Sequence, residues 1–469
     1  MTFVQFEFLV FFALVLALYW GIRSRRAQNA LLVVASLVFY GWVHWWFVGL
    51  LAFSTLLDFY VGIAMADRPK HKRLLLTVSM CGNLGLLGAF KYLDFFIENV
   101  GAVLTALGFG YSPQTLGIFL PVGISFFTFQ TMSYTFDIYR GKLTPRRDLL
   151  DYATFVTMFP QLVAGPVERA RNLLPQVEQV RVFSHERFRS GFSLALWGAV
   201  KKLLVADTVA MYVDKVFAMP EPSAPLIAAA TFGFAIQILA DFSAYTDIAR
   251  GTARMLGFEL MENFRSPYLA TNPSDFWKRW HISFSSWIHE YVYVPFCGRR
   301  RTGSRRLAAT YAALLLSGLW HGASWNFVLW GAYHASLLAG YRLAGSVVPK
   351  SVSQHPLLRP AKILLMFLFT LGGWLLFREQ DFSRLLLYAS LPWELGSTVY
   401  SAAFAALLTV SVSGAVFLAL ALVVNHFVIP RLRERAVWPL FEGLFWACAI
   451  AVIFLFAREA ADEFIYFQF

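Results

Sequence analysis

The chain alternates between long apolar runs and short polar or basic loops from one end to the other. Several runs approach or exceed the roughly 20 residues that an α-helix needs to cross a bilayer. The candidate spans cover residues 4–22, 30–46, 47–66, 74–90, 115–136, 190–206, 223–240, 363–377, 399–427 and 437–456. This pattern predicts an all-α, polytopic membrane protein with one integral domain, residues 1–457, and a C-terminal tail, residues 458–469.

Two segments interrupt the series of spans. Residues 150–165 and 272–296 are apolar in part but too short or too charged to cross a membrane cleanly. Segments of this kind lie on the membrane surface or enter it and return, sheltered by surrounding protein. We therefore expect them to line a cavity.

A single uncharged stretch, residues 307–341, is longer than one perpendicular span requires. Basic residues flank both of its ends, which places both ends on the same side of the membrane. The simplest geometry is two helices that meet at a break. The candidate break residues are Gly318, Gly322 and Ser324, and they surround His321.

Composition and charge support the membrane assignment. Hydrophobic residues make up 58% of the 469 and charged residues only 14%, which leaves no room for a sizeable soluble domain. The net charge of +12 is concentrated in the loops, so it indicates topology and not nucleic-acid binding. The five basic clusters are residues 23–26, 68–73, 140–147, 299–306 and 431–435. If all five face the cytoplasm, both termini lie outside.

Other sequence features exclude some classes of protein. The first apolar run contains Glu7 and lacks a basic leader and a small-residue cleavage site, so we expect a retained helix and not a cleaved signal. Cys81, Cys297 and Cys448 share no close spacing, and the acidic residues show no metal-ligand spacing. We predict no disulfide framework and no metal. The absence of mirrored halves argues against a transporter.

His321 is the first candidate for chemistry. Ionisable groups at membrane depth are costly and tend to be retained for a function. The alternative is a core histidine whose nitrogens are satisfied by neighbours such as Ser317 or Asn326. Histidine has an unperturbed pKa of about 6.5, so it can accept and return a proton at cellular pH. His334 lies on the second helix with nothing near it that breaks that helix.

His281 is the second candidate. It lies in "FWKRWHISFSSW", residues 276–287, among tryptophans and the cations Lys278 and Arg279. Trp, Lys and Arg at a membrane surface are ordinary anchors. The functional alternative is that the cations bind a polyanionic cytosolic ligand while tryptophans, Trp280 among them, form the walls of its passage.

Six quoted segments together resemble the membrane-bound O-acyltransferase (MBOAT) family nearly end to end. They are "LPVGISFFTFQTMSYTFDIYRG" at 120–141, "FPQLVAGPVERA" at 159–170, "DFSAYTDIARG" at 241–251, "MENFRSPYLATNPSDFW" at 261–277, "FWKRWHISFSSW" at 276–287 and "GLWHGASWNFVLWGAYHA" at 318–335. Within the family they are most similar to members that acetylate bacterial exopolysaccharides. Ala244 departs from the glycine expected in the third segment, which bears on packing more than on chemistry.

The resemblance implies a fold and three catalytic positions. The expected fold has about 11 or 12 transmembrane helices with re-entrant or interfacial helices around a central tunnel. His321 matches the family's catalytic histidine, and His281 matches the second histidine on the cytosolic approach. The C-terminal "FIYFQF", residues 464–469, resembles a motif that presents a tyrosine, here Tyr466, as acyl carrier. An aromatic anchor is the alternative for this tail.

The resemblance also implies a donor and a partner. Acetyl-CoA would be the acyl donor, not a permanently bound cofactor, with Lys278, Arg279 and Trp280 as its predicted binding residues. A periplasmic SGNH hydrolase-like acetyltransferase would complete transfer to alginate or cellulose at the bacterial inner membrane. Two alternatives stay open: D-alanyl transfer to a cell-wall polymer, and a proton-coupled transporter with histidines as relays.

Overall fold

The computed structural model describes residues 1–110, 115, 117, 120–163, 165–298, 302–347, 355–395 and 398–456. Its α-helices are α1 (Phe6–Gly21), α2 (Arg25–Gly41), α3 (Phe47–Asp67), α4 (Lys72–Leu87), α5 (Leu93–Ala106), α6 (Ile124–Tyr139), α7 (Leu149–Thr157), α8 (Phe159–Leu162), α9 (Ala170–Glu178), α10 (His185–Val200), α11 (Asp207–Phe217), α12 (Ala224–Met255), α13 (Pro273–Trp277), α14 (Ile282–Ile288), α15 (Val294–Cys297), α16 (Gly303–His321), α17 (Trp325–Val347), α19 (Arg359–Arg378), α20 (Phe382–Ser390), α21 (Thr398–Val423), α22 (Ile429–Arg433) and α23 (Trp438–Phe456).

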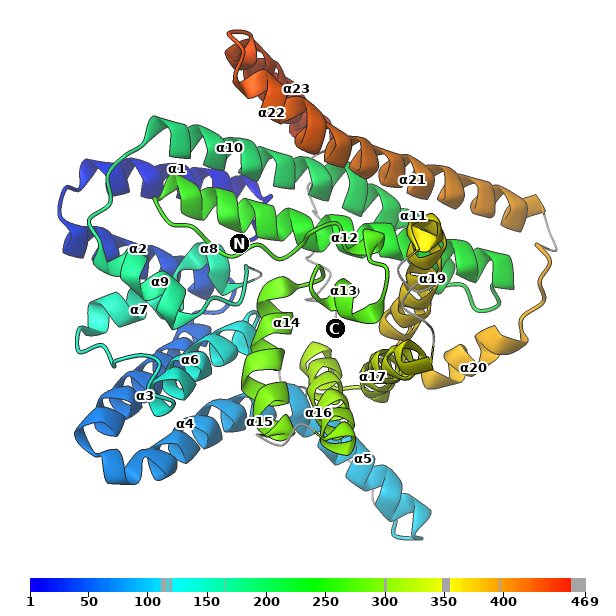
Figure 1. The fold of residues 1–469 in the computed structure, drawn as a ribbon, viewed down its shortest axis with the longest axis horizontal. Helices are drawn as coiled ribbons and strands as arrows, with labels where there is room; N and C mark the ends of the chain where they lie inside the picture. The colour runs from blue at the N-terminus through cyan, green and yellow to red at the C-terminus, as the bar shows by residue number, and fades with distance from the viewer. Residues whose placement is uncertain are drawn as a thin grey trace.

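Short helical segments of other types connect these helices. The 3-10 segments are η1 (Pro69–His71), η4 (Pro267–Leu269) and η6 (Pro356–Leu358), and the π-helical segments are η2 (Gly88–Tyr92), η3 (Lys201–Ala206), η5 (His289–Tyr293) and η7 (Val424–Val428). Within the described ranges the chain has no β-strand, which confirms the predicted all-α class (Figure 1).

Six helical segments of the described chain are long and apolar enough to cross a membrane. They are Phe47–Asp67, Pro69–Ala106, Ala224–Met255, Pro356–Arg378, Thr398–Arg433 and Trp438–Phe456. The apolar α1 is shorter than a span by the same measure. The chain is therefore a polytopic membrane protein, while the expected total of about 11 or 12 spans stays a prediction.

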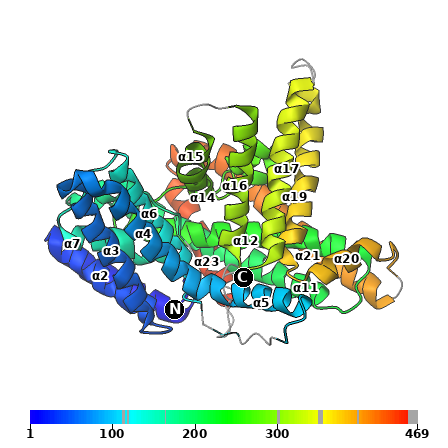
Figure 2. The same cartoon turned by 90° about the horizontal axis from the view of Figure 1, so that it is seen from below.

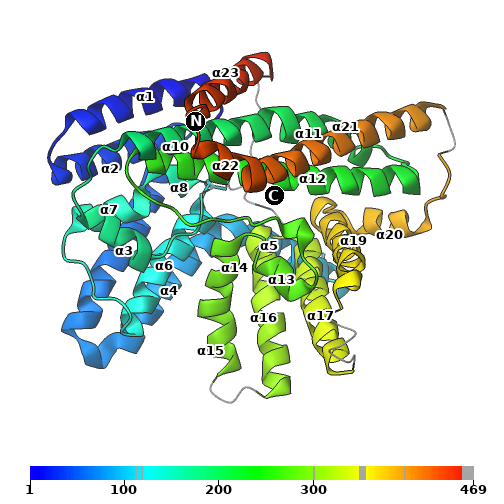
Figure 3. The ribbon, with the colours of Figure 1, turned by 45° about the horizontal axis from the view of Figure 1, so that its top comes forward.

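Helix α12 is the central element of the fold. It packs against α10 and α21, which both lie above it in Figure 1, and the pair α16 and α17 projects away from it together with α14 (Figure 3). We expected this span to end near Asp241, but the helix continues to Met255. The reason is a set of buried ion pairs: Lys202 of η3 binds Asp241 at 2.9 Å and Asp207 at 2.8 Å. The carboxylate therefore stays within the helix.

We expect the variant Lys202→Met to lower the stability of the whole helical core. The side chains of Lys202, Asp207 and Asp241 are 2%, 7% and 3% exposed, so methionine leaves two buried carboxylates without their shared cation. Breaking a buried ion pair in this way costs about 3–5 kcal/mol. Thermal melting of the purified protein in detergent measures the loss. The control is Lys215→Met, because Lys215 is exposed on α11; a similar melting temperature for the two variants would contradict this role.

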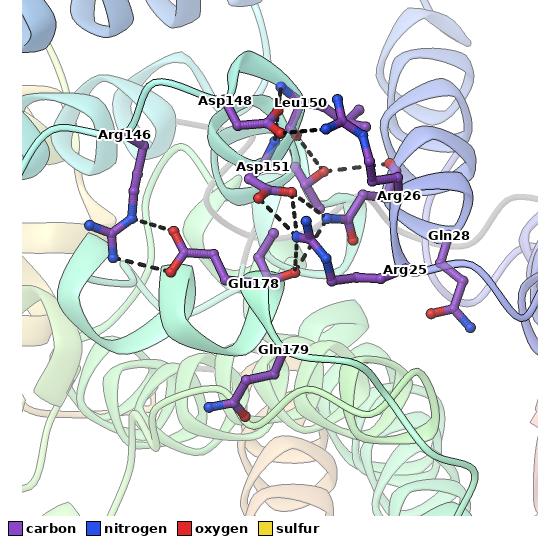
Figure 4. Close-up of polar contacts among 12 residues, drawn as sticks. Arg25, Arg26, Gln28, Arg146, Asp148, Leu150, Asp151, Glu178 and Gln179 are labelled. Atoms are coloured by element: carbon purple, nitrogen blue, oxygen red, sulfur yellow. Dashed lines mark hydrogen bonds and ion pairs between the residues drawn. The ribbon is translucent and has the colours of Figure 1, made fainter.

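Ion pairs bring several of the predicted cytoplasmic loops together on one face, which we call the basic face. Arg25, at the start of α2, binds Asp151 of α7 at 2.8 Å, and Arg26 binds Asp148 at 3.1 Å. Arg146 also pairs with Glu178 at the end of α9 (Figure 4). The loops 23–26 and 140–147 therefore lie on the same side, as their charges predict.

Further contacts extend the basic face to two more clusters. Arg147 binds Asp67, which precedes the cluster at 68–73. Arg181 donates to the Arg25 carbonyl oxygen at 3.3 Å, which places the start of α10 on the same face. Arg189, in the second turn of α10, pairs with Glu442 of α23, and α23 follows the cluster at 431–435 in the chain. The fifth cluster, 299–306, lies partly outside the described residues.

The two segments that we predicted not to cross the membrane form short helices. Residues 150–165 contain most of α7 and all of α8, and residues 272–296 contain α13, α14, η5 and most of α15. The second segment lies against α16 and α17. The predicted boundary of the integral domain at residue 457, and the tail 458–469, fall outside the described residues.

Candidate active site

The break in the uncharged stretch forms where the sequence predicts it. Helix α16 ends at His321, α17 begins at Trp325, and Gly322 between them is extended. Glycines hold the two helices close together. A Cβ atom on Gly318 would overlap the Phe327 carbonyl oxygen, and one on Gly331 would overlap that of Leu314. This close crossing fixes His321 at the end of α16.

His321 lies in an aromatic pocket and is 5% exposed. Its ring centroid is 5.0 Å from that of Phe377 and 5.1 Å from that of Trp330, with both rings edge-on. Phe377 is the penultimate residue of α19, a candidate span. The imidazole is therefore held by three different helices.

His281 has a backbone conformation that is rare for a residue with a side chain. Its φ of 44° and ψ of 54° are left-handed, and it directly precedes α14. Asn263 supports this turn, because its carbonyl accepts from the Ile282 N–H at 3.0 Å and its side chain accepts from the Ser283 hydroxyl at 2.6 Å. Strained backbone of this kind concentrates at functional sites.

The side chain of His281 is buried without hydrogen bonds. It is 1% exposed, and neither ring nitrogen has a hydrogen-bond partner among the described residues. Its ring centroid lies 4.7 Å from that of Phe242 and 5.0 Å from that of Phe284. A buried polar group usually finds a partner, so these nitrogens are available to a ligand. The burial also contradicts the interpretation of His281 as a surface anchor.

The two histidines share aromatic neighbours. The Phe284 ring lies 5.0 Å from that of His281 and 6.0 Å from that of His321. The Trp320 ring lies 5.9 Å and 4.9 Å from the same two rings. Segments that are forty residues apart in the sequence therefore converge on one site.

Helix α12 gives the order of the two histidines relative to the basic face. His281 contacts Phe242, 13 residues or about 20 Å from the Met255 end, which lies on the basic face. Phe377, which contacts His321, lies beside Phe234, 21 residues or about 30 Å from that end. Both histidines therefore lie beside the central part of α12, and the α12 residue that contacts His281 is nearer the basic face.

His334 lies in the same aromatic core but is separated from His321. Its ring centroid is 4.8 Å from that of Trp330 and 5.2 Å from that of Trp277. Trp330 therefore stands between His334 and His321. The His334 Nδ1 atom has no hydrogen-bond partner within the described residues.

The three predicted donor-binding residues do not share one environment. Lys278 is exposed. Arg279 binds Asp275 at 2.7 Å and contacts the Arg265 carbonyl oxygen at 3.3 Å. Trp280 is 1% exposed and packs 4.7 Å from Trp374, between centroids. Lys278 is therefore open to a ligand and Arg279 is partly exposed beside Asp275, whereas Trp280 faces the core.

A second charged cluster was not singled out from the sequence. Glu290 of η5 is bound by Arg171 at 2.6 Å and by Lys142 at 2.7 Å, and it lies 3.7 Å from Arg169. Hydrogen bonding to Arg171 and Lys142 lowers the pKa of Glu290 to about 2. The sequence signal was available: Arg169 is the penultimate residue of the quoted segment 159–170, and Arg171 follows the segment directly.

Two other predictions concern residues or ligands that the structure does not test. Tyr466 lies outside the described residues. Within the described ranges no group of three or more His, Cys, Asp or Glu side chains has a geometry that suits a metal ion. The predictions of a tyrosine carrier and of chemistry without a metal stay predictions.

Two kinds of comparison relate the chain to known proteins. Residues 144–379 match the sequence model of the MBOAT, membrane-bound O-acyltransferase family. The chain is 37% identical over 377 residues to the probable alginate O-acetylase AlgI of Azotobacter vinelandii, covering 79% of this chain and 74% of the relative. It is 31% identical to the peptidoglycan O-acetyltransferase of Helicobacter pylori, covering 75% and 71%.

A third relative is more distant. The teichoic acid D-alanyltransferase of Bacillus subtilis is 26% identical over 263 residues, which cover 53% of this chain and 65% of the relative. The family match spans α7 to α19 and includes the buried His281, His321 and His334. The chain therefore belongs to the membrane-bound O-acyltransferase family and is an O-acyltransferase of the multi-pass membrane type.

Proposed function

We propose that this enzyme takes an acetyl group from acetyl-CoA at its basic face and transfers it to an acceptor at the opposite face. The observation that carries the proposal is that the buried His281 and His321 share aromatic neighbours beside α12, with His281 nearer the basic face. In this proposal the basic face is cytoplasmic, the membrane is the bacterial inner membrane, and both termini are periplasmic. The acetyl group is destined for an exopolysaccharide such as alginate or cellulose.

A water-filled entrance from the basic face is supported by the loop beside α12. This loop follows α12 and leads to α13. Its Asn263 contacts Thr246, and its Tyr268 donates to the Ala235 carbonyl oxygen. Thr246 and Ala235 lie about 14 and 30 Å along α12 from Met255. Between them Arg265 has a side chain that is 65% exposed and paired with Glu262. Exposed charges at this depth beside a spanning helix need water, not lipid.

The same entrance suits a polyanionic donor. Lys278 and Arg279 lie on the chain segment that borders this loop, because Arg279 contacts Arg265 at 3.3 Å. The phosphates of CoA would bind these cations, and the acyl end would continue toward His281. Trp280 keeps the predicted role only as a wall behind the donor, since its ring packs into the core.

The chemistry assigned to His321 is general acid and base catalysis. The imidazole accepts the proton of the acceptor hydroxyl as the new C–O bond forms at the thioester carbon. The C–S bond then breaks, and the imidazolium returns the proton to the departing thiolate. The sum is an ester and free CoA, with no other reactant. A role of this kind contributes about 10² to 10⁴ in rate.

We expect Tyr466→Phe to abolish acetylation of the polymer if the tail carries the acyl group. The phenol, with an unperturbed pKa of about 10, is a better acceptor than an alkyl alcohol, and an aryl ester remains an activated donor. Phenylalanine removes only the reacting oxygen and keeps the ring that a membrane anchor needs. The measurement is ester-linked acetate on the polymer from cells. Normal acetate would eliminate the relay while leaving the role of His321 intact.

Beyond the outer face, we propose that a periplasmic SGNH hydrolase-like partner receives the acetyl group and selects the polymer.

One experiment on the purified protein in lipid vesicles distinguishes acetyl transfer from D-alanyl transfer and from transport without acyl transfer. Acetyl-CoA and a D-alanyl carrier thioester are supplied separately, and release of free thiol is measured for the wild type and for His321→Ala. Consumption of acetyl-CoA by the wild type alone supports the proposal. Consumption of only the D-alanyl thioester, or of neither, contradicts it.

A further inference from the structure

A lysine within an apolar helical segment binds the end of the helix that carries His321. Lys91 lies in η2, inside the candidate span Pro69–Ala106. Its Nζ atom donates to the Trp320 carbonyl oxygen at 2.5 Å and to the His321 carbonyl oxygen at 3.1 Å. The next helix, α5, passes beside α16 and α17 (Figure 2). Lys91 therefore reaches the predicted catalytic residue through its backbone.

Tyr92, the residue after Lys91, also binds the C-terminal end of α16, so the two residues together cap this helix. The Tyr92 hydroxyl donates to the Leu319 carbonyl oxygen at 2.6 Å. The last four carbonyls of an α-helix have no partner within the helix, and here three of them are bound by two successive residues. The π-helical geometry of η2 lets both residues reach the same helix end. Such turns are frequent at functional sites.

The charge of Lys91 distinguishes it from an ordinary cap. No described carboxylate forms an ion pair with its ammonium group, whose described polar partners are the two carbonyls. The end of a helix carries roughly half a negative charge, so α16 itself supplies the counter-charge. A charged side chain at membrane depth is costly, which argues that it is kept for a function. A hydroxyl such as that of Tyr92 would satisfy the carbonyls without this cost.

We propose that Lys91 is a positioning residue for His321, which fixes the last turn of α16 and places a positive charge at the site. The proposal rests on the proposed role of His321 as the base. Holding the two terminal carbonyls sets the direction in which the imidazole leaves the helix. The ammonium also favours a transition state in which negative charge develops on the thioester oxygen, because it is fixed in advance and screened little by water.

Three variants test the proposal. Lys91→Met removes the charge and both hydrogen bonds, Lys91→Arg keeps a cation and donors, and Tyr92→Phe removes the adjacent bond to Leu319 but leaves the charge. Initial rates of acetyl-CoA consumption by purified protein in lipid give kcat and the KM for acetyl-CoA. Thermal melting of each variant reports any structural loss. If Lys91→Met does not fold, Lys91→Gln replaces it.

For Lys91→Met we expect kcat to fall by about 10²-fold, the loss typical of a reacting group displaced by about an ångström. The KM for acetyl-CoA should stay within about twofold, because the donor is bound elsewhere. Arginine should restore at least a tenth of the wild-type kcat, and Tyr92→Phe should stay within about threefold of it.

Equal kcat values for Lys91→Met and Tyr92→Phe, or no recovery with arginine, would overturn the positioning role and leave Lys91 as a structural cap. A wild type that consumes no acetyl-CoA would instead overturn the proposed function. The two failures are therefore distinguishable.

Discussion

Replacing His321 with alanine is expected to leave a folded protein that transfers no acyl group at a measurable rate. The imidazole is the only group that the substitution removes from the pocket formed by Phe377, Trp330 and Trp320. Loss of a general base costs about 10² to 10⁴ in rate. Initial rates of acetyl-CoA consumption by the purified variant, with thermal melting as a check of folding, measure the effect.

The matched control for this prediction is His334→Ala. His334 is 2% exposed in the same aromatic core, and Trp330 separates it from His321, so its loss should alter packing without removing the base. We expect this control to retain transfer. Activity that survives in His321→Ala, or is lost equally in both variants at equal stability, would contradict the assignment of the base to His321.

The second large effect is expected from Gly318→Ala, which adds one methyl group and removes no functional group. The new Cβ atom would overlap the Phe327 carbonyl oxygen and lie 2.9 Å from the carbonyl carbon. Both atoms belong to the backbone of α17 and cannot rotate away, so α16 and α17 must separate. A displacement of about 1 Å in the attached His321 reduces the rate by about 10²-fold. Initial rates of acetyl-CoA consumption by the purified variant measure the effect.

Gly340→Ala provides the control on the same pair of helices. A Cβ atom at Gly340 would meet no heavy atom within 4 Å, and alanine favours a helix over glycine by about 1 kcal/mol. This variant should keep full activity and melt no lower than the wild type. Wild-type rates for Gly318→Ala would show that the close crossing does not position the site.

The sequence predicts the helical class and the central features of the site because both depend on local patterns. Apolar runs identify helices, and the small residues around His321 identify the break between α16 and α17. The convergence of His281 on His321 follows from the family resemblance alone, since no local pattern specifies contacts between segments forty residues apart.

Other features could not be predicted because they depend on tertiary contacts. The continuation of α12 beyond Asp241 requires Lys202, which lies on another helix. The role of Lys91 was missed because a single lysine between two apolar runs is also what a loop would contain. The burial of Trp280 shows the same limit, since a tryptophan beside two cations is as typical of an interface as of a core.

The central claim is that an imidazole within the membrane connects a donor on the basic face with an acceptor on the opposite face. The most direct test uses vesicles with the protein in one known orientation and labelled acetyl-CoA confined to one side. With donor at the basic face, we expect labelled, ester-linked acetate accessible only from the other side, and none with His321→Ala. Label that appears only on the donor side, or transfer that is equally fast with donor at the opposite face, would contradict transfer across the membrane through His321.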